Sequence, residues 1–392
     1  MKLACVVHRF GADIAGGSEA HCRHVAEHLA ARHDVTILTS CAVDHITWRN
    51  EYEPGGSRLG ALNVLRFPSA RQRSLHRFSE ISELAFSGTT GDLEQETWFR
   101  ENGPDVPGLI EHLRMHGQTY DVVLFWAFRY AEVYFGLPLV SERAVLVPTA
   151  EEDPVIRMSI LERFFGLPAG YVFLTPEEQE LVERRMTVAP PPSCIIGSGL
   201  DPARPHSPVD LASLGVHAPF VLYLGRIDPN KGCGDLLHHF MRFKAEQPGP
   251  VKLVMAGPAS MPLPVHDDVQ YLGFVDEPTR DALLQQAACL AMPSRYESLS
   301  LVLLEAWNYG LPAVVNGHCA VLKGQAQRAN GALYYRNYDE FARCLSVLLE
   351  RPSLARELGR QGLAYVEQEY RWPVVTAKVN ALLDEVVARR GR

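Results

Sequence analysis

Short apolar runs alternate with segments of helical periodicity along the whole of this 392-residue chain. Parallel strands need a helical crossover between them, so this alternation predicts parallel sheets covered by helices. The predicted strands of the first half are residues 3–7, 35–39, 64–67, 122–126, 144–148 and 171–174. Those of the second half are residues 220–224, 252–256, 269–272, 289–292 and 313–315. The pattern therefore predicts an α/β protein.

The length of the chain favours two domains over one. Residues 189–205 separate the halves, contain a triple proline and show little periodicity, and the beginning of this segment is typical of a linker. We therefore predict two Rossmann-like halves that join near residues 190–200. Residues 69–105 are polar and indicate an insertion with mobile parts, to which the sequence assigns no role.

The composition is that of an ordinary globular protein, with 47% hydrophobic and 21% charged residues. No apolar run approaches the roughly 18 residues of a membrane-spanning helix, and residues 1–10 indicate a strand rather than a signal peptide. The eight cysteines show no metal-binding spacing, which is typical of free thiols in a reducing compartment. We therefore expect a cytoplasmic protein without a transmembrane segment.

The net charge of −8 is confined to the first half of the chain. Residues 1–195 contain 18 Lys and Arg against 26 Asp and Glu, whereas residues 196–392 contain 20 of each class. An acidic first half argues against binding to nucleic acid and against docking on an anionic membrane surface. We expect neither kind of partner.

One stretch, residues 293–312, combines two carboxylates with a helix start and reads P-S-R-Y-E-S-L-S-L-V-L-L-E-A-W-N-Y-G-L-P. Glu297 follows a predicted strand, and Glu305 stands after seven intervening residues, inside a compact apolar helix. Ser300 is a good N-cap for that helix. A helix that begins after a parallel strand offers free N–H groups and a partial positive charge, which suit a phosphate group.

A second motif, Y-L-G-R-I-D-P-N-K-G, includes the end of the predicted strand at residues 220–224. It places Arg226 and Lys231 after that strand, with Gly225 and Gly232 beside them. Two cations there can stabilise negative charge on phosphate groups without a metal ion. No D-x-D sequence occurs in the chain, so we expect no metal site of that kind. The alternative is a pair of solvated surface cations.

The pattern P-S-x-x-E followed by L-E-A-x-x-x-G-x-P, together with G-R-x-x-x-x-K-G, resembles the nucleotide-sugar signature of glycosyltransferase family 4. These are retaining enzymes of the GT-B architecture. The resemblance therefore implies two Rossmann-like domains that face each other across a cleft. It implies an acceptor-binding domain at residues 1–195, a donor-binding domain at residues 196–370, and a last helix at residues 371–392 that crosses back to the first domain. It is most specific between residues 221 and 312.

The resemblance also implies roles for single residues. Glu305 would bind the ribose of a nucleotide-diphosphate sugar, Glu297 would bind the hydroxyls of its sugar, and two cations and backbone N–H groups would hold the diphosphate. The implied catalytic residues are Glu297, Arg226 and Lys231. The implied donor-binding residues are Gly16, Gly17, Gly225, Arg226, Lys231, Gly257, Phe274, Val275, Glu297, Ser300, Leu301 and Glu305.

Polar residues also follow two predicted strands of the first half, at the edge where open α/β sheets bind ligands. Many relatives carry a histidine at one of these places, whereas this chain has Phe-Arg-Tyr at residues 128–130 and Glu-Glu-Asp at residues 151–153. The acidic run favours a neutral or amine-bearing acceptor. Solvated or helix-capping carboxylates are the alternative. The acceptor-binding candidates are His8, Arg129, Glu151 and Glu152.

Taken with the resemblance, the sequence predicts a retaining glycosyltransferase of hexosyltransferase type that needs neither a metal nor a cofactor. It would move a sugar from a UDP or GDP sugar to a hydroxyl of a glycan, a glycoconjugate or a small metabolite. One alternative is a sugar-nucleotide epimerase of the same fold, which would change the donor without any acceptor. The other is a non-catalytic subunit that binds a nucleotide sugar.

Overall fold

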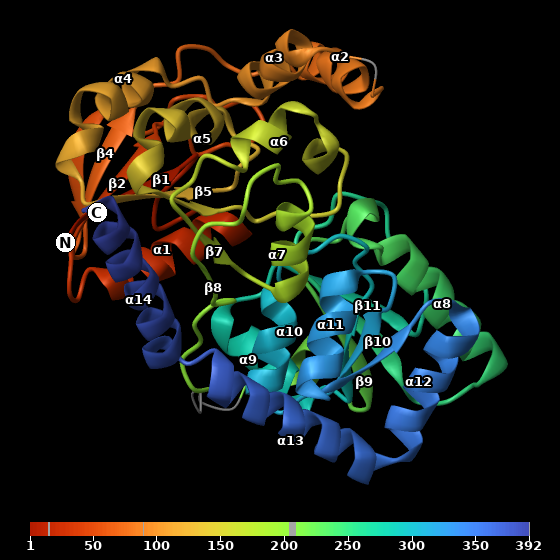
Figure 1. Cartoon of the computed structure of the whole chain (residues 1–392). Coiled ribbons are helices and arrows are strands. Elements are labelled where there is room, and N and C mark those ends of the chain that lie inside the picture. Colours follow the sequence, from red (N-terminus) through yellow and green to blue (C-terminus); the bar gives the residue numbers. More distant parts are fainter. Residues whose placement is uncertain (15, 89, 204–208, 392) are drawn as a thin grey trace. The chain divides into compact units, whose positions relative to one another are not determined.

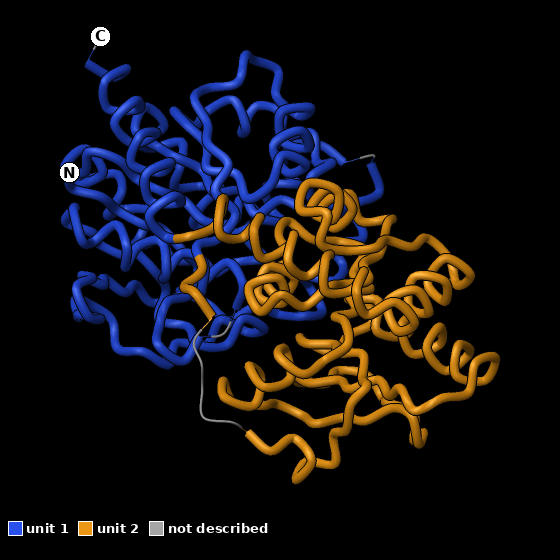
Figure 2. Tube along the Cα trace, turned by 90° about the horizontal axis from the view of Figure 1, so that it is seen from below, with its two compact units in different colours: residues 1–199, 372–392 blue, residues 200–371 orange. Residues whose placement is uncertain are grey.

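The computed structural model describes residues 1–14, 16–88, 90–203 and 209–391. The chain divides into two compact units (Figure 2). Unit 1 comprises Met1–Gly199 and Trp372–Arg392, and unit 2 comprises Leu200–Arg371. Among the described residues, no helix combines the length and the apolarity that crossing a membrane requires.

Unit 1 is built on an eight-stranded sheet in the order β3-β4-β2-β1-β5-β6-β7-β8 (Figure 1). Its neighbouring strands pair in parallel except β3 and β4, which are antiparallel. The strands are β1 (Lys2–Val7), β2 (Asp34–Ser40), β3 (Gly55–Leu59), β4 (Leu62–Phe67), β5 (Val122–Trp126), β6 (Ala144–Val147), β7 (Gly170–Phe173) and β8 (Ser193–Ile195). The helices are α1 (Gly17–Leu29), α2 (Leu75–Phe86), α3 (Asp92–Asn102), α4 (Pro107–His116), α5 (Ala131–Gly136), α6 (Ile160–Phe164), α7 (Pro176–Glu183) and α14 (Trp372–Arg390).

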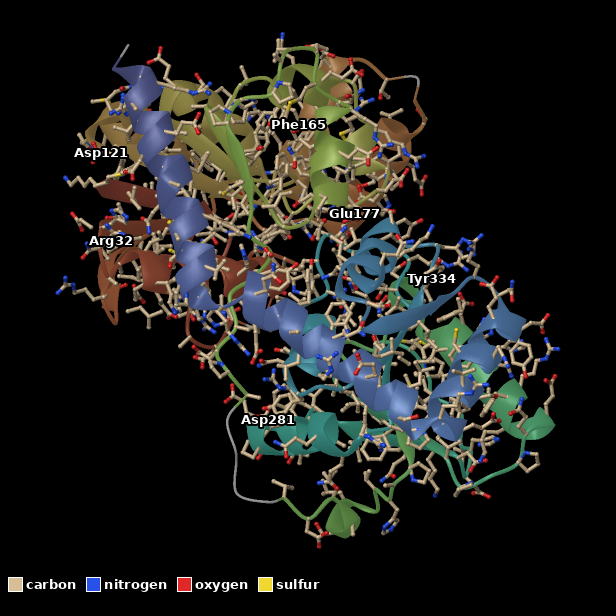
Figure 3. All side chains as sticks on the ribbon, turned by 60° about the horizontal axis from the view of Figure 1, so that its bottom comes forward. Arg32, Asp121, Phe165, Glu177, Asp281 and Tyr334 are labelled. Carbon is tan, nitrogen blue, oxygen red and sulfur yellow. The ribbon has the colours of Figure 1, made fainter. Side chains whose placement is uncertain are left out.

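The core of unit 1 lies around its central strands. β1 and β5 are continuous apolar runs, as expected for parallel strands that are covered on both faces. One large cluster of buried side chains, which includes Phe165, fills the space between the sheet and its helices (Figure 3). The last helix, α14, contacts α1 and β8. The carboxyl ends of β1 and β5 therefore lie side by side in a rigid sheet.

Unit 2 is built on a six-stranded parallel sheet in the order β11-β10-β9-β12-β13-β14. Its strands are β9 (Phe220–Leu224), β10 (Lys252–Ala256), β11 (Val269–Gly273), β12 (Cys289–Met292), β13 (Ala313–Asn316) and β14 (Ala332–Tyr335). Its helices are α8 (Cys233–Glu246), α9 (Glu277–Gln286), α10 (Leu301–Asn308), α11 (Ala320–Ala329), α12 (Tyr338–Glu350) and α13 (Pro352–Glu369). A second core cluster joins α8, α12 and α13 to this sheet.

The strand order of unit 2 reverses between β9 and β12, which are neighbours in space but not in sequence. Open α/β sheets bind ligands outside the carboxyl ends of the strands at such a reversal. The loops that leave β9 and β12 there are residues 225–232 and 293–300, the two stretches that carry the sequence motifs. The topology thus brings both motifs to one edge of one sheet.

The predicted α/β class with parallel sheets is confirmed. Three strands were not predicted, namely β3, β8 and β14. β8 lies in the segment that begins as an expected linker, and residues 204–205 of that segment lie outside the described residues. Residues 69–105, expected to be an insertion with mobile parts, form α2 and α3, which pack together, and residue 89 lies outside the described residues.

Candidate functional site

Two glycines shape the carboxyl ends of β9 and β10. Gly225 has φ 132° and Gly257 has φ 135°, backbone conformations that side chains other than glycine rarely adopt. A Cβ atom on Gly257 would overlap the carbonyl oxygen of Gly225. Glycine at residue 257 therefore lets the two strand ends come close together.

Lys231 and Glu297 meet between the two motif-bearing loops. Lys231 ends a single 3₁₀ turn, η5 (Pro229–Lys231), and Gly232 follows it with φ 72°. A Cβ atom on Gly232 would overlap the carbonyl oxygen of Pro293, so glycine is needed for the two loops to pack. The Lys231 Nζ donates to Glu297 Oε1 over 2.9 Å, and the Glu297 side chain is only 10% exposed. A charge-assisted hydrogen bond in such a site is strong and fixes both groups.

Arg226 is the more exposed cation of the same loop, with 53% of its side chain accessible. Its Nε lies 3.5 Å from Asp228 Oδ2. Burial tends to raise the pKa of Asp228, but hydrogen bonds from Asn230 and Ser260 and the charge of Arg226 lower it, so this carboxylate stays ionised. Asp228 was not predicted as a site residue, although it stands inside the second motif.

The N-terminus of α10 lies directly after the loop that carries Glu297. Ser300 is buried, and its hydroxyl accepts a hydrogen bond from the Leu303 N–H over 3.3 Å, which makes it the N-cap. Leu301 is the first residue of the helix. Free N–H groups at the start of this helix therefore lie next to the Lys231–Glu297 pair, at the carboxyl edge of the sheet.

Glu305 lies farther along α10 and has an unpredicted partner. Its Oε1 lies 3.2 Å from the Arg280 guanidinium on α9. Burial raises the pKa of Glu305, Arg280 lowers it, and the neighbouring Asp281, also on α9, raises it (Figure 3). No motif marks Arg280, and 25 residues separate it from Glu305, so only the tertiary structure reveals the pair.

Phe274 and Val275 follow β11 at the same edge of the sheet. The Phe274 side chain is 83% exposed, whereas Val275 is partly buried. Phe274 thus offers a free aromatic face, as stacking on a nucleobase would require.

In unit 1, His8 belongs to a buried cluster at the carboxyl end of β1. Its Nε2 lies 2.9 Å from Glu19 Oε1, and its ring stacks on Tyr130 with centroids 3.7 Å apart. Arg9 also contacts the Glu19 carboxylate. Burial alone would raise the pKa of Glu19, but His8 and Arg9 together hold it well below its usual range. Neither Glu19 nor Arg9 was predicted, although Glu19 stands two residues after the glycine pair, in the first turn of α1.

Gly16 and Gly17 have different surroundings. Gly16 is the N-cap of α1, and a Cβ atom on it would overlap the Glu19 carboxylate. A Cβ atom on Gly17 would meet nothing within 4 Å. Gly16 is therefore required by the His8–Glu19 cluster, whereas Gly17 leaves the start of the helix uncovered.

The other acceptor candidates of unit 1 lie around Arg129. Its guanidinium donates to Asp153 Oδ2 over 2.7 Å, and Asp153 also accepts a hydrogen bond from the Val155 N–H over 3.0 Å. Asp153 thus caps the following turn and holds Arg129. Glu151 is half-buried and Glu152 is exposed.

The structure therefore places the predicted donor residues of unit 2 at the ends of β9, β10, β11 and β12 and on α10. Gly16, Gly17 and the acceptor candidates belong to unit 1, where His8 contacts Glu19 and Arg129 contacts Asp153.

Comparison with known proteins agrees with this picture. Residues 218–351 match the family model described as glycosyl transferases group 1. A D-inositol 3-phosphate glycosyltransferase of Jonesia denitrificans is 25% identical over 256 residues, which are 59% of this chain and 60% of that protein. An MMP alpha-(1->4)-mannosyltransferase of Mycolicibacterium hassiacum is 28% identical over 170 residues, 41% of each chain. The matches thus span less than two thirds of these relatives.

Solved structures extend the likeness to the whole fold. Sucrose-phosphate synthase from Thermosynechococcus elongatus has a TM-score of 0.70 at 17% identity, over 99% of both chains. HepE of Anabaena, solved in complex with UDP-glucose, has a TM-score of 0.70 at 14% identity, over 98% of this chain and 100% of that one. The resemblance inferred from the motifs is confirmed at the level of the group 1 glycosyltransferases, whose family model matches residues 218–351 of a chain with the GT-B fold, whereas family 4 itself stays a prediction.

Proposed function

We propose that this protein is a retaining glycosyltransferase of family 4 that transfers a sugar from a nucleotide-diphosphate sugar to a hydroxyl acceptor without a metal ion. The observation that carries the proposal is the ion pair of Lys231 and Glu297 beside the start of α10. It combines a fixed cation, a fixed carboxylate and free helix N–H groups at one strand end. Those are the groups that a sugar diphosphate needs.

The donor would lie along the carboxyl edge of unit 2. Its diphosphate would accept hydrogen bonds from N–H groups at the start of α10 and lie near the positive charges of Arg226 and Lys231. These charges would stabilise the negative charge that develops on the diphosphate when its bond to the sugar breaks. Glu305 would accept hydrogen bonds from the ribose, and the exposed Phe274 would stack on the base. The complexes of HepE with UDP and with UDP-glucose favour a uracil nucleotide over GDP.

The proposed chemistry needs no enzyme nucleophile. The bond between the anomeric carbon and the phosphate oxygen breaks, the acceptor oxygen bonds to the same face of that carbon, and the leaving phosphate takes the proton of the acceptor hydroxyl. Glu297 would hold the sugar hydroxyls, and Lys231 would hold both Glu297 and the phosphate. Their roles are therefore coupled through one hydrogen bond.

The acceptor would bind to unit 1, where His8, Arg129, Glu151 and Glu152 remain the candidates. Asp153 already holds Arg129 and caps a turn, and Glu151 and Glu152 add two further negative charges to this region. That charge favours a neutral or amine-bearing acceptor over a phosphorylated one.

The test is incubation of the protein with UDP-glucose or GDP-mannose and a panel of sugar acceptors. Nucleotide release is measured by coupled assay, and the configuration of the new bond is measured by NMR. We expect a product of retained configuration, with activity that persists in EDTA and is lost in Glu297→Gln. An inverted product, or activity abolished by EDTA and restored by Mg²⁺ or Mn²⁺, would contradict the proposal. Conversion of the donor sugar without an acceptor would identify an epimerase, and donor binding without turnover would indicate a binding subunit.

A further inference from the structure

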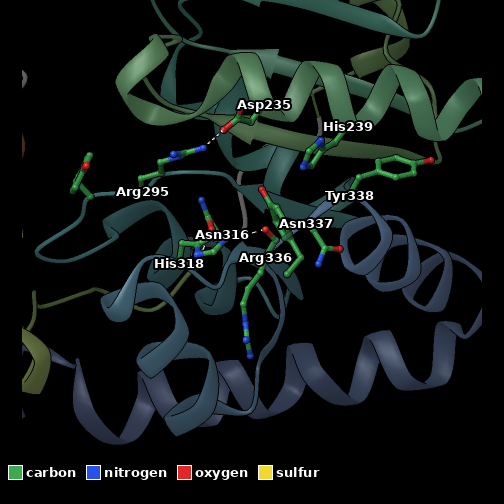
Figure 4. Close-up of a pocket in the computed structure, with 10 residues that line it drawn as sticks. Asp235, His239, Arg295, Asn316, His318, Arg336, Asn337 and Tyr338 are labelled. Atoms are coloured by element: carbon green, nitrogen blue, oxygen red, sulfur yellow. Dashed lines mark hydrogen bonds and ion pairs between the residues drawn. The ribbon is translucent and has the colours of Figure 1, made fainter.

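A cavity of about 500 Å³ opens at the carboxyl edge of the unit 2 sheet (Figure 4). It lies among the ends of β13 and β14, the side of α8 and the start of the loop that leaves β12. None of its lining residues belongs to the predicted donor-binding set. A cavity of this size falls within the range of roughly 300–1,000 Å³ that is usual for small-molecule sites.

The strand order separates this cavity from the donor residues. The donor residues follow β9, β10, β11 and β12, whereas the cavity is formed chiefly after β13 and β14, on the other side of β12. Only the loop at residues 293–300 contributes to both, with Arg295 and Tyr296 in the cavity and Glu297 in the donor set. The two sites are therefore neighbours on one sheet edge, built by different side chains.

The wall on α8 contains a buried nitrogen that the protein leaves unused. The His239 ring packs against Tyr335 and Tyr338, with centroids 6.0 Å and 5.8 Å apart. Its Nδ1 is buried and has no hydrogen-bond partner among the described residues. Burial lowers the pKa of His239, so the ring is neutral near pH 7. A buried polar atom without a partner is uncommon in proteins and calls for an explanation, of which a bound ligand is one.

The charges around the cavity largely cancel. Arg295 and Asp235 form an ion pair of 3.0 Å at its rim. The Arg336 side chain points away from both of them and from His239 (Figure 4). Asn337 is occupied as the N-cap of α12, where it accepts a hydrogen bond from a backbone N–H. An anion would find no concentrated positive charge here, so the cavity favours a neutral ligand.

The remaining lining groups suit a sugar ring. Tyr296, which is 46% exposed, offers aromatic surface to the C–H face of a pyranose, Tyr335 and Tyr338 are buried in the cavity wall, and imidazole and amide groups can exchange hydrogen bonds with the sugar hydroxyls. We propose that this cavity is a second saccharide site, which holds one or two neutral sugar rings separately from the nucleotide-sugar donor. The proposal does not depend on the donor assignment, because it uses none of the donor residues.

The experiment measures binding by saturation-transfer NMR with glucose, mannose, galactose, N-acetylglucosamine, maltose and sucrose as probes, each with and without saturating UDP. Glucose 6-phosphate is the anionic probe. We expect at least one neutral saccharide to bind in both conditions. His239→Phe, which removes the unpartnered nitrogen, and Tyr296→Ala, which changes an exposed ring, should each weaken that binding at least tenfold. His238→Phe alters the exposed neighbour on the same helix and should leave affinity within twofold.

Several outcomes would overturn the proposal. They are the absence of binding by every neutral probe, loss of saccharide binding when UDP is added, and binding of glucose 6-phosphate alone. Equal affinity of the wild type, His239→Phe and Tyr296→Ala would also overturn it. Should His239→Phe fail to fold, Tyr296→Ala decides, since its side chain is exposed.

Discussion

Replacing Lys231 by methionine tests the centre of the candidate site, because it keeps an unbranched stem of similar length and removes the ammonium group. That group lies 2.9 Å from Glu297 Oε1. At an effective dielectric constant of about 20, two unit charges at this distance attract by about 6 kcal/mol. Taking the 90%-buried carboxylate out of water offsets much of that attraction, so the net value is smaller. Hydrogen bonds to charged groups contribute about 1.5–3 kcal/mol net, and we expect the pair to lie in that range.

The measurement is a double-mutant cycle of Lys231→Met and Glu297→Gln, read as the free energy of unfolding in urea. The expected coupling energy is about 1.5–3 kcal/mol. In the transferase assay, Lys231→Met should also lower kcat on the order of 10²–10³, the usual effect of losing one preorganised charge at a developing anion.

The matched control is Lys252→Met, which changes a half-buried lysine at the opposite, amino end of β10 and should leave kcat within twofold. A coupling energy below about 0.5 kcal/mol would refute the energetic reasoning, since distant, independent sites deviate from additivity by only that much. Equal turnover of Lys231→Met and Lys252→Met would refute the assigned role of the cation.

Three further predictions test other parts of the molecule. Glu305→Gln removes the charge beside Arg280 and should weaken UDP-glucose binding about tenfold or more in calorimetry, whereas unchanged affinity would contradict the ribose role. Gly257→Ala should lower Tm strongly because its methyl group would overlap a carbonyl oxygen, whereas Gly249→Ala, where a Cβ meets nothing within 4 Å, should not. Burial lowers the pKa of His21 to about 4, and the unfolded chain binds this proton below about pH 6.5. The free energy of unfolding should therefore fall by up to about 3 kcal/mol between pH 6.5 and 4, and His21→Gln, followed by urea unfolding at each pH, should flatten that slope.

The parallel sheets could be predicted from the sequence because strands buried on both faces are continuous apolar runs. β5, β9, β10 and β12 have the predicted bounds for this reason. Two of the three missed strands, β3 and β8, lack that signal. β3 reads G-G-S-R-L and is largely exposed at the edge of its sheet, and β8 has only three residues. Their pairing depends on neighbouring strands and not on their own composition.

In the candidate site, too, single residues could be predicted from local sequence motifs, whereas their contacts depend on the tertiary structure. Lys231 and Glu297 were each marked by a motif, but their contact spans 66 residues and follows from the adjacency of β9 and β12. Arg280 belongs to no motif, so its pairing with Glu305 had no signal in the sequence. Glu19 stands two residues after a marked glycine pair, but its link to His8 is a tertiary contact with no signal in the sequence.

The two cations of the second motif are not equivalent, and their surroundings separate their roles. Lys231 is committed to a nearly buried carboxylate, so its first effect is to hold Glu297 in one orientation. Arg226 is about half exposed, and the 3.5 Å separation of its Nε from Asp228 is longer than a good hydrogen bond. A diphosphate would therefore interact first with Arg226. It would interact with Lys231 only when a sugar also contacts Glu297. In the proposed enzyme this arrangement makes the stabilisation of the leaving phosphate depend on correct placement of the sugar, which is how binding energy is directed to the transition state.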